Sequence, residues 1–399
     1  MADCKSAAAQ SPNKSKKIAK YQQYNIVSNV ANQAKYTDPN FINSWGLLWL
    51  NNILYVANSA TNIISRLNRR GTAAAVPILL PTNTPDGSVI GVTGLAANKL
   101  KTGFLVPPTN LPAQVLFVGN SGAIGAIDAN GTVAVVIQGT GAHPNVYQSV
   151  AQLGNYLYAT NFALSRVDVY SSTFVLVGSF TDAALTAAGY APFGITVINK
   201  KELVVSYAKQ NTTVPPSNAL AGDGNGYLDL VCHPEVAATG QTPTIKRLAN
   251  RGVLNAPYSL IPISHDRLLV GNHGDGTINV FDLKTKAALT PDGQPLLNCS
   301  GQPVNIDSLW GLTFTYKKQK KPKKCHKKKH SDCSSSSSAS ASSSSDSESD
   351  DCKKTQVPGE TTLWFSAGPD GGAQGLVGKL VTCKSESDCK PKCELPPVC

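Results

Sequence analysis

Short runs of apolar residues, separated by turns rich in Asn, Gly and Asp, follow one another along most of the chain. One pattern recurs: a first run with Gly or Pro near its start, a second run that ends in Asn or a small residue, and a third run after a turn. Its six copies start roughly 45 to 65 residues apart, at Ser44, Val92, Tyr147, Pro192, Pro257 and Leu309. Such short runs are typical of β-strands, and no long segment has the 3.6-residue period of a helix.

A repeat of this length with three or four strands predicts the blades of a β-propeller. We therefore predict an all-β chain with one six-bladed β-propeller over residues 21–380; a pair of β-sandwiches is the alternative. The segment Tyr21–Ser28 alternates like a strand and has no partner in the first copy. We expect it to form the outer strand of blade six and so to close the ring. The hairpin of blade six between Tyr316 and Thr361 carries an insertion.

Charge is concentrated in that insertion. The chain has 36 basic and 25 acidic residues, a net charge of +11, and the segment Lys317–Lys354 holds 11 Lys against five acids. Lysine, serine and acidic runs cannot bury enough apolar surface to fold, so we predict disorder over residues 317–360 and in a basic arm over residues 1–20. The lysine run Lys317–His330 would attract an anionic surface or nucleic acid. The basic charge therefore indicates partners of the appendages and not of the ring.

Cysteines are concentrated in the same appendages. Only Cys232 and Cys299 fall within the blades, and a Cys-rich tail occupies residues 381–399. The tail spacing is not that of a zinc site, and we interpret four cysteines as disulfide or cross-linking candidates: Cys383, Cys389, Cys393 and Cys399. They favour self-assembly or protein partners in an oxidising, extracellular or virion-surface setting. The polar N-terminus, by contrast, lacks the apolar core of an ordinary signal peptide.

Two groups of residues have the chemistry to bind a cation. Four thiol and imidazole ligands for zinc lie within nine residues of the insertion: Cys325, His326, His330 and Cys333. Four amides follow second strands and would surround the channel mouth, where they could bind calcium or a polar ligand: Asn58, Asn120, Asn161 and Asn272. The alternative for the first group is a solvated loop. The alternative for the amides is that Asn makes each turn.

The segment Asn272–Gly276 places an imidazole and a carboxylate two residues apart. His273 and Asp275 could act as a general base pair or as metal ligands, and His143 could reach the same mouth. The alternative is an Asp-Gly turn beside an exposed histidine. No G-x-S-x-G, H-E-x-x-H or dinucleotide motif is present, and no apolar run is long enough for a membrane-spanning helix.

Several ordered motifs carry a family resemblance. They include Asp38–Gly46, Tyr190–Phe193, Leu254–Pro257, Leu268–Gly276 and Ser366–Pro369. Together they resemble a family of six-bladed β-propeller proteins, largely bacterial and often secreted, and more distantly NHL-repeat and gluconolactonase-like propellers. Homologues of such proteins also occur in large DNA viruses. The resemblance implies the fold over about residues 21–380, but no activity. A gluconolactonase-type calcium site would also need an acidic ligand, which the first-strand motifs lack.

These observations favour a non-enzymatic binding or structural platform, with assembly or cross-linking through the cysteine-rich appendages. The alternative is a hydrolase or lactonase-like enzyme that acts at the channel mouth. A deep pocket that joins His273, Asp275 and a second titratable group would favour the enzyme. A mouth that is closed by side chains and lined by turn amides would favour the platform.

Overall fold

A computed structural model describes residues 20–82, 89–139, 145–212, 218–264, 266–283, 294–316 and 361–383. The chain divides into two units. One unit contains residues 1–315 and 362–399 and holds the strands described below, and the other contains residues 316–361. The predicted insertion over residues 317–360 lies outside the described residues, as do the arm over residues 1–19 and residues 384–399 of the tail.

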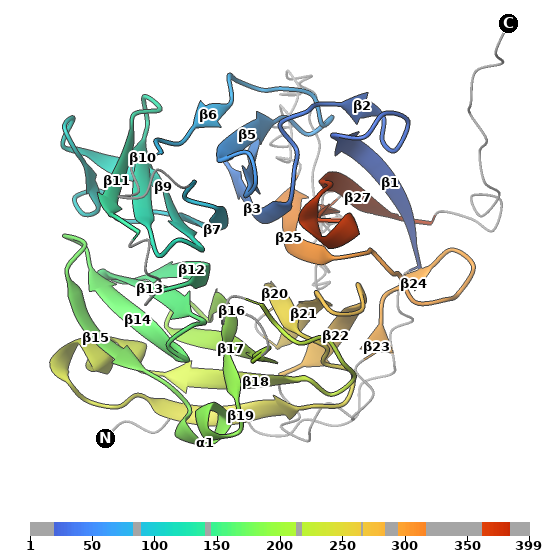
Figure 1. Cartoon of the computed structure of the whole chain (residues 1–399). Coiled ribbons are helices and arrows are strands. Elements are labelled where there is room, and N and C mark those ends of the chain that lie inside the picture. Colours follow the sequence, from blue (N-terminus) through green and yellow to red (C-terminus); the bar gives the residue numbers. More distant parts are fainter. Residues whose placement is uncertain are drawn as a thin grey trace, which may run out of the picture. The chain divides into compact units, whose positions relative to one another are not determined.

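The described strands form six sheets around a common centre, so the predicted six-bladed β-propeller is confirmed (Figure 1). From the inner strand outward, blade one contains β3 (Ser44–Leu50), β4 (Ile53–Asn58), β5 (Ile63–Leu67) and β6 (Ile78–Leu79). Blade two contains β7 (Val92–Ala97), β9 (Leu111–Gly119), β10 (Ile124–Asp128) and β11 (Val133–Ile137). Blade three contains β12 (Tyr147–Leu153), β13 (Tyr156–Asn161), β14 (Arg166–Ser171) and β15 (Leu176–Phe180). A short strand, β8 (Leu105–Val106), pairs with β9 in blade two.

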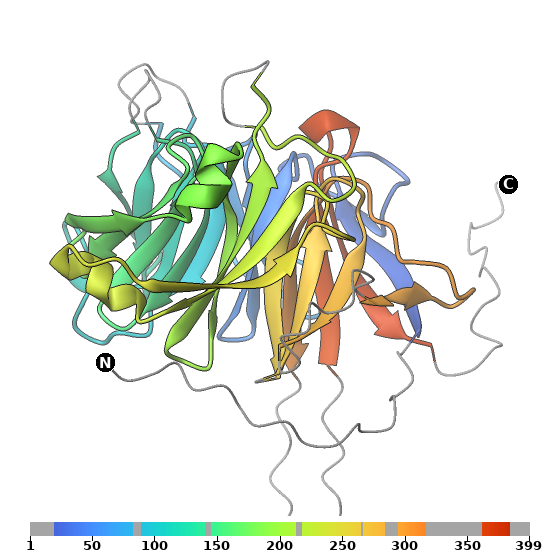
Figure 2. The same ribbon diagram turned by 90° about the horizontal axis from the view of Figure 1, so that it is seen from below.

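Blades four and five contain β16 (Tyr190–Ile198), β17 (Glu202–Lys209), β18 (Gly226–Cys232) and β19 (Thr244–Asn250), and then β20 (Pro257–Ser264), β21 (Arg267–Asn272), β22 (Ile278–Asp282) and β23 (Gln294–Pro295). In the described part of the chain three short helices lie between strands: α1 (Ala183–Ala187), η1 (Pro234–Thr239) and η2 (Asp370–Gly372). The perpendicular view shows the strands running between the two faces of the ring (Figure 2). None of the helices in the described part is long and apolar enough to cross a membrane.

Blade six joins the two ends of the chain. Its strands are β25 (Leu309–Tyr316), β26 (Thr361–Ala367), β27 (Leu376–Thr382) and β1 (Lys20–Ser28), flanked by β2 (Tyr36–Thr37) and β24 (Leu297–Asn298). The N-terminal strand β1 pairs antiparallel with β27, from Tyr21 opposite Thr382 to Ser28 opposite Leu376. The expectation that the segment Tyr21–Ser28 closes the ring is therefore confirmed.

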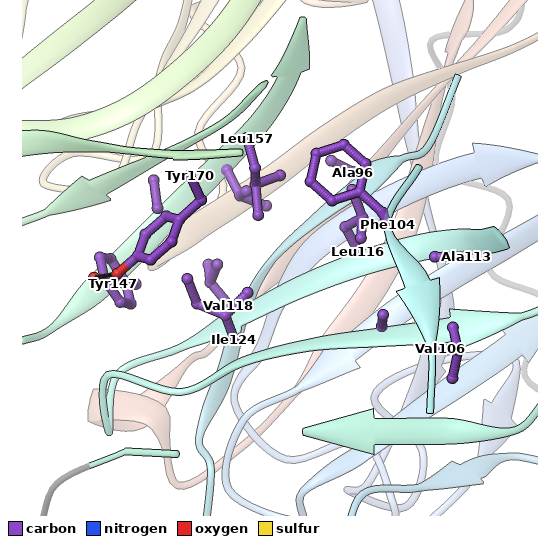
Figure 3. Close-up of a cluster of buried hydrophobic side chains, with 13 residues drawn as sticks. Ala96, Phe104, Val106, Ala113, Leu116, Val118, Ile124, Tyr147, Leu157 and Tyr170 are labelled. Atoms are coloured by element: carbon purple, nitrogen blue, oxygen red, sulfur yellow. Dashed lines mark hydrogen bonds between the residues drawn. The ribbon is translucent and has the colours of Figure 1, made fainter. Parts of the chain in front are cut away.

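Apolar side chains fill the spaces between neighbouring blades. A buried cluster lies at each blade-to-blade interface of the described chain, and a further aromatic cluster lies at the centre. Figure 3 shows one of them, where Tyr147 and Leu157 of blade three face Leu116 and Val118 of blade two. A single sheet with two apolar faces is not stable alone, so each blade depends on both neighbours.

The inner strands of neighbouring blades approach each other at glycines. A side chain at Gly46 would lie 2.5 Å from the Thr93 carbonyl of the next blade, and one at Gly194 would overlap the Tyr258 carbonyl. The same contacts occur at Gly94, which faces Ser149, and at Gly311, which faces Trp45. This close approach explains the Gly in the first strand of the sequence repeat.

Buried hydroxyl groups join the blades at the same level. Thr93 Oγ1 donates to the Tyr147 carbonyl (2.8 Å), Thr160 Oγ1 to the Phe193 carbonyl (3.0 Å) and Ser206 Oγ to the Pro257 carbonyl (2.6 Å). In blade six, Ser366 Oγ donates to the Trp45 carbonyl of blade one. These bonds satisfy carbonyls that the inner strands would otherwise bury without a partner.

A disulfide bond between Cys299 and Cys383 fastens the closing strand. Cys383 follows β27, and its backbone N–H donates to the Lys20 carbonyl at the start of β1 (2.9 Å). Lys20 also pairs in parallel with Leu297 of β24, two residues before Cys299. The bond therefore links the two segments that flank the start of β1. Cys383, which the sequence suggested as a cross-linker, is thus bonded within its own chain.

We predict that Gly194→Ala destabilises the ring, because the new methyl group must displace the backbone carbonyl of Tyr258. The expected loss in the free energy of unfolding is about 1–3 kcal/mol or more, as for other overpacked cores. Gly271→Ala is the matched control, since its methyl group would meet side-chain atoms and no backbone: Leu309 and Leu312 at 3.1 Å and Ser259 Cβ at 3.3 Å. Urea denaturation measures both variants. Equal losses would contradict the proposed close approach of the strands.

We also predict that the double variant Cys299→Ser/Cys383→Ser is less stable than the oxidised protein by about 2–4 kcal/mol. A crosslink between residues 84 positions apart restricts the unfolded chain strongly. Urea midpoints of the two proteins provide the measurement. Unchanged midpoints would mean that strand pairing alone holds β1 in place.

Candidate binding site at the channel mouth

The channel of the ring is closed near its middle by side chains from one position of the sequence repeat. In blades one, four, five and six this position, directly before the Gly or Ser of the motif, is aromatic: Trp45, Phe193, Tyr258 and Trp310. These side chains are at most 7% exposed. The Tyr258 hydroxyl crosses the channel and donates to the Gln148 carbonyl of blade three (2.9 Å). The channel is therefore a packed core with a mouth on each face.

The mouth at the ends of the inner strands has both apolar and polar surface. It contains a cavity of about 280 Å³ whose walls include Leu48, Val150, Val197 and Ile261. Lys99 is the one charged residue in this lining of described residues.

The opposite mouth, where the inner strands begin, contains the candidate site, which we call the mouth pocket. Its volume is about 350 Å³, and its described lining consists of Asn43, Trp45, Phe193, Asn211, Asn218, Ala219, His273, Ser308, Trp310, Gly368, Gly371 and Gly372. These residues come from the loops of blades four, five, six and one and from the inner strands β3, β16 and β25. Apart from the imidazole, no side chain in this described lining is titratable.

Three aromatic rings stack in the wall of the mouth pocket. Trp310 lies between Trp45 and His273, with centroid distances of 3.6 Å on both sides and interplanar angles of 18° and 17°. Both faces of the Trp310 indole are therefore covered. Its edge, which carries Nε1, is the part that remains for a ligand.

The environment of His273 fixes its protonation state. The Leu309 carbonyl lies 3.3 Å from Nδ1, and because a carbonyl only accepts, Nδ1 carries the proton and Nε2 the lone pair. Burial lowers the pKa of His273 to about 4, although the Leu309 carbonyl and Asp307 oppose the shift. The imidazole is thus neutral near pH 7, and it is a weak base.

Asp275 does not pair with His273. Its Oδ1 accepts from the backbone N–H of Thr277 (2.9 Å) and from the Thr277 hydroxyl (2.8 Å). Successive side chains of the tight turn point in different directions, so adjacency in sequence does not bring the two groups together. His143, the third candidate for acid–base chemistry, lies outside the described residues.

Three of the four amides that were predicted to surround the channel mouth are buried inside the ring instead. Asn58, Asn161 and Asn272 are fully buried. Asn58 bonds Ser44 and Ser65 within blade one, whereas Asn161 Nδ2 donates to Asp168 (2.8 Å). In blade five, Asn272 Nδ2 donates to the Val253 carbonyl (2.6 Å). A buried amide needs partners for its polar atoms, and the Nδ2 groups of these side chains find them within and between the blades, although Asn272 Oδ1 is buried without a partner in the described structure.

The fourth amide, Asn120, is half-buried, and its backbone N–H donates to the Gly91 carbonyl (3.0 Å). None of the four belongs to the described lining of the mouth pocket. Ligand binding by these amides stays a prediction.

No group of three or more metal-ligating side chains occurs among the described residues. The zinc candidates Cys325, His326, His330 and Cys333 lie outside them, as do Cys389, Cys393 and Cys399 of the tail. The lysine run Lys317–His330 lies outside them too. Metal binding and cross-linking at these positions stay predictions.

Asn43, Trp45 and Trp310 were not predicted from the sequence as site residues. The signal was present in the repeat, because the residue before the motif Gly is aromatic in three of the four blades that have Gly there. An aromatic residue at the start of an inner strand is typical of a buried core, so only the ring shows that it borders a pocket.

Two viral proteins are similar to the chain. The uncharacterized protein R648 of Acanthamoeba polyphaga mimivirus is 31% identical over 308 residues, which cover 73% of this chain and 73% of that protein. The uncharacterized protein L690 of the same virus is 27% identical over 316 residues, or 75% of this chain and 80% of that protein. No protein-family model matches the chain. The relatives agree with the expectation of homologues in large DNA viruses; a mostly bacterial, secreted family stays an expectation.

Solved structures with a similar fold include virginiamycin B lyase from Staphylococcus aureus, at 15% identity and a TM-score of 0.43 over 91% of this chain and 99% of that chain. A streptogramin B lyase structure has 14% identity and a TM-score of 0.45, over 91% of this chain and 97% of that chain. At this level of identity the likeness concerns the fold alone.

We predict that the imidazole of His273 titrates near pH 4 and makes the protein less stable in acid. An unfolded histidine titrates at about 6.5, so between these values the unfolded state binds the proton more tightly. This contribution is fully present above pH 6.5 and is lost towards pH 4, at up to about 1.4 kcal/mol per pH unit. Urea denaturation from about pH 7 to 4.5 measures it.

The variant His273→Phe, which keeps a ring against Trp310, should lose this part of the pH dependence. An NMR titration of the imidazole gives a direct check. A midpoint close to the ordinary value of about 6.5 would contradict the burial of His273.

Proposed function

The chain belongs to the family of the mimivirus protein R648, and we propose that its ring is a non-enzymatic binding module that holds a small ligand in the mouth pocket. The volume of about 350 Å³ lies at the lower end of the range of small-molecule pockets, about 300–1,000 Å³. Aromatic walls with a few polar groups are typical of such sites. The ring would serve as a rigid support, because every blade packs against two neighbours.

The observation that carries this proposal is that the hydrogen bond of the His273 imidazole in the described structure goes to a backbone carbonyl and not to a carboxylate, although the charge of Asp307 acts on it. General acid–base catalysis works best when the pKa of the catalytic group lies near the working pH. The pKa of His273 is lowered to about 4, and its expected partner Asp275 bonds Thr277 instead. No carboxylate belongs to the described lining of the mouth pocket. A site of this kind can orient a ligand, but it offers no base and acid pair.

We further propose that the appendages, and not the ring, mediate assembly. The lysine run supports contacts with an anionic surface, and the tail cysteines support cross-links between chains in an oxidising setting. The Cys299–Cys383 bond is consistent with such a setting.

The alternative function is that of a hydrolase or lactonase-like enzyme at the same mouth. In that case His273 would be the base, because it is the one histidine in the described lining and its Nε2 carries the lone pair. Its low pKa makes this function second to binding.

A ligand screen combined with an activity assay separates the two functions. We expect saturation-transfer NMR with a library of small neutral fragments to detect binders that Trp310→Phe weakens, and we expect no hydrolysis of p-nitrophenyl acetate or δ-valerolactone that depends on His273. Trp49→Phe, outside the pocket, is the matched control for binding. Hydrolysis that His273→Phe abolishes, and that the control His233→Gln retains, would overturn the proposal in favour of the enzyme.

A further inference from the structure

Three polar atoms in the lining of the mouth pocket have no partner within the described protein. Trp310 Nε1–H makes no hydrogen bond to a described residue, and Nε2 of His273 makes none either, since the ring uses only Nδ1. Asn43 accepts from Trp45 Nε1 through Oδ1 (2.6 Å), and its Nδ2 donors are unused. None of these atoms is among the buried atoms sealed from solvent without a partner. Around the Trp310 edge the pocket thus presents two N–H donor groups and one lone pair, and the Asn218 amide and the Ser308 hydroxyl are further polar groups of its lining.

The arrangement disfavours charged ligands. An anion would accept from Trp310 and Asn43 but would face the lone pair of the neutral His273. A cation would face the N–H groups of Trp310 and Asn43. No lysine, arginine, aspartate or glutamate belongs to the described lining, so no side chain there would neutralise either charge.

A hydroxyl group satisfies both kinds of atom, because it accepts one hydrogen bond and donates another. The donor of Trp310 and the acceptor of His273 belong to stacked rings whose centroids are 3.6 Å apart, so both atoms border the same pocket. Resting on the proposed binding function, we infer that the mouth pocket binds a neutral, hydroxyl-rich ligand, namely a sugar ring of a carbohydrate. Asn43 Nδ2 would donate to a further hydroxyl, and the Ser308 oxygen, whose own proton is donated to Asp307 (3.1 Å), would accept from another.

Glycines keep this group of atoms accessible. A side chain at Gly368 would lie 3.1 Å from Trp310 Nε1 and would overlap Asn43 Oδ1. Gly371 and Gly372, in the short helix η2, complete this side of the pocket with positive φ values of 61° and 90°. The volume of about 350 Å³ suits one or two sugar rings and not a long polymer.

The experiment compares matched sugars on the full-length oxidised protein. Saturation-transfer NMR and isothermal titration calorimetry are run with D-glucose, D-galactose, D-mannose and N-acetylglucosamine, alongside the anionic D-glucuronate and the cationic D-glucosamine. We expect at least one neutral sugar to bind more tightly than its charged counterparts. Trp310→Phe should weaken that binding about three- to tenfold, as for the loss of one hydrogen bond.

Two further variants keep the test valid if Trp310→Phe fails to fold. Asn43→Asp retains the Oδ1 acceptor for Trp45 and replaces the donor by an oxygen, so it should also weaken binding. Its matched control, Asn155→Asp, lies in an exposed turn outside the pocket and should change nothing. Trp49→Phe is the control for the tryptophan change.

The outcomes distinguish this inference from the proposed function. If neutral fragments bind in a Trp310-dependent manner but no neutral sugar does, the carbohydrate inference is overturned and the binding function stands. Equal affinity for glucose and glucuronate would also overturn it. If neither fragments nor sugars bind, both proposals fail.

Discussion

The structure depends on the close approach of the inner strands of neighbouring blades. Gly46, Gly94, Gly194 and Gly311 allow it, because a side chain at any of them would press against the next blade. Hydroxyls such as Thr160 then reach across and satisfy the carbonyls at this level. The apolar faces of the sheets can be buried against each other only when this inner ring closes.

The same constraint creates the candidate site. Because the inner strands lie so close together, the side chains just before the glycines meet at the centre, where Trp45, Phe193, Tyr258 and Trp310 close the channel. A closed channel leaves a shallow mouth on each face instead of a pore. On the face where the inner strands begin, the loops of four blades surround the edge of Trp310 and the neutral imidazole of His273. The site thus consists of the edge of a core side chain, Trp310, and of the loops around it. Substitutions in these loops can change the site without changing the packing of the core.

The fold could be predicted in detail, whereas the site could be predicted only in part. The repeat placed the inner strands and β1 correctly, because a strand without a partner must pair at the gap in the ring. His273 was identified as a candidate, but its expected partner Asp275 bonds its own turn. The amides Asn58, Asn161 and Asn272 were expected at the mouth and are buried inside blades. Side-chain direction after a strand depends on the turn, which residue spacing does not reveal.

The sequence by itself determined the six blades, the closing strand and the separation of a weakly charged ring from basic and cysteine-rich appendages, because periodicity and composition are local properties. Only the tertiary structure decided that Cys299 pairs with Cys383, 84 residues away, since spacing cannot identify a disulfide partner. It also decided that Trp310 stacks between Trp45 and His273. These contacts join residues that are far apart in the sequence, and the stacking of Trp45 on Trp310 joins blade one to blade six, so it exists only after the ring has closed.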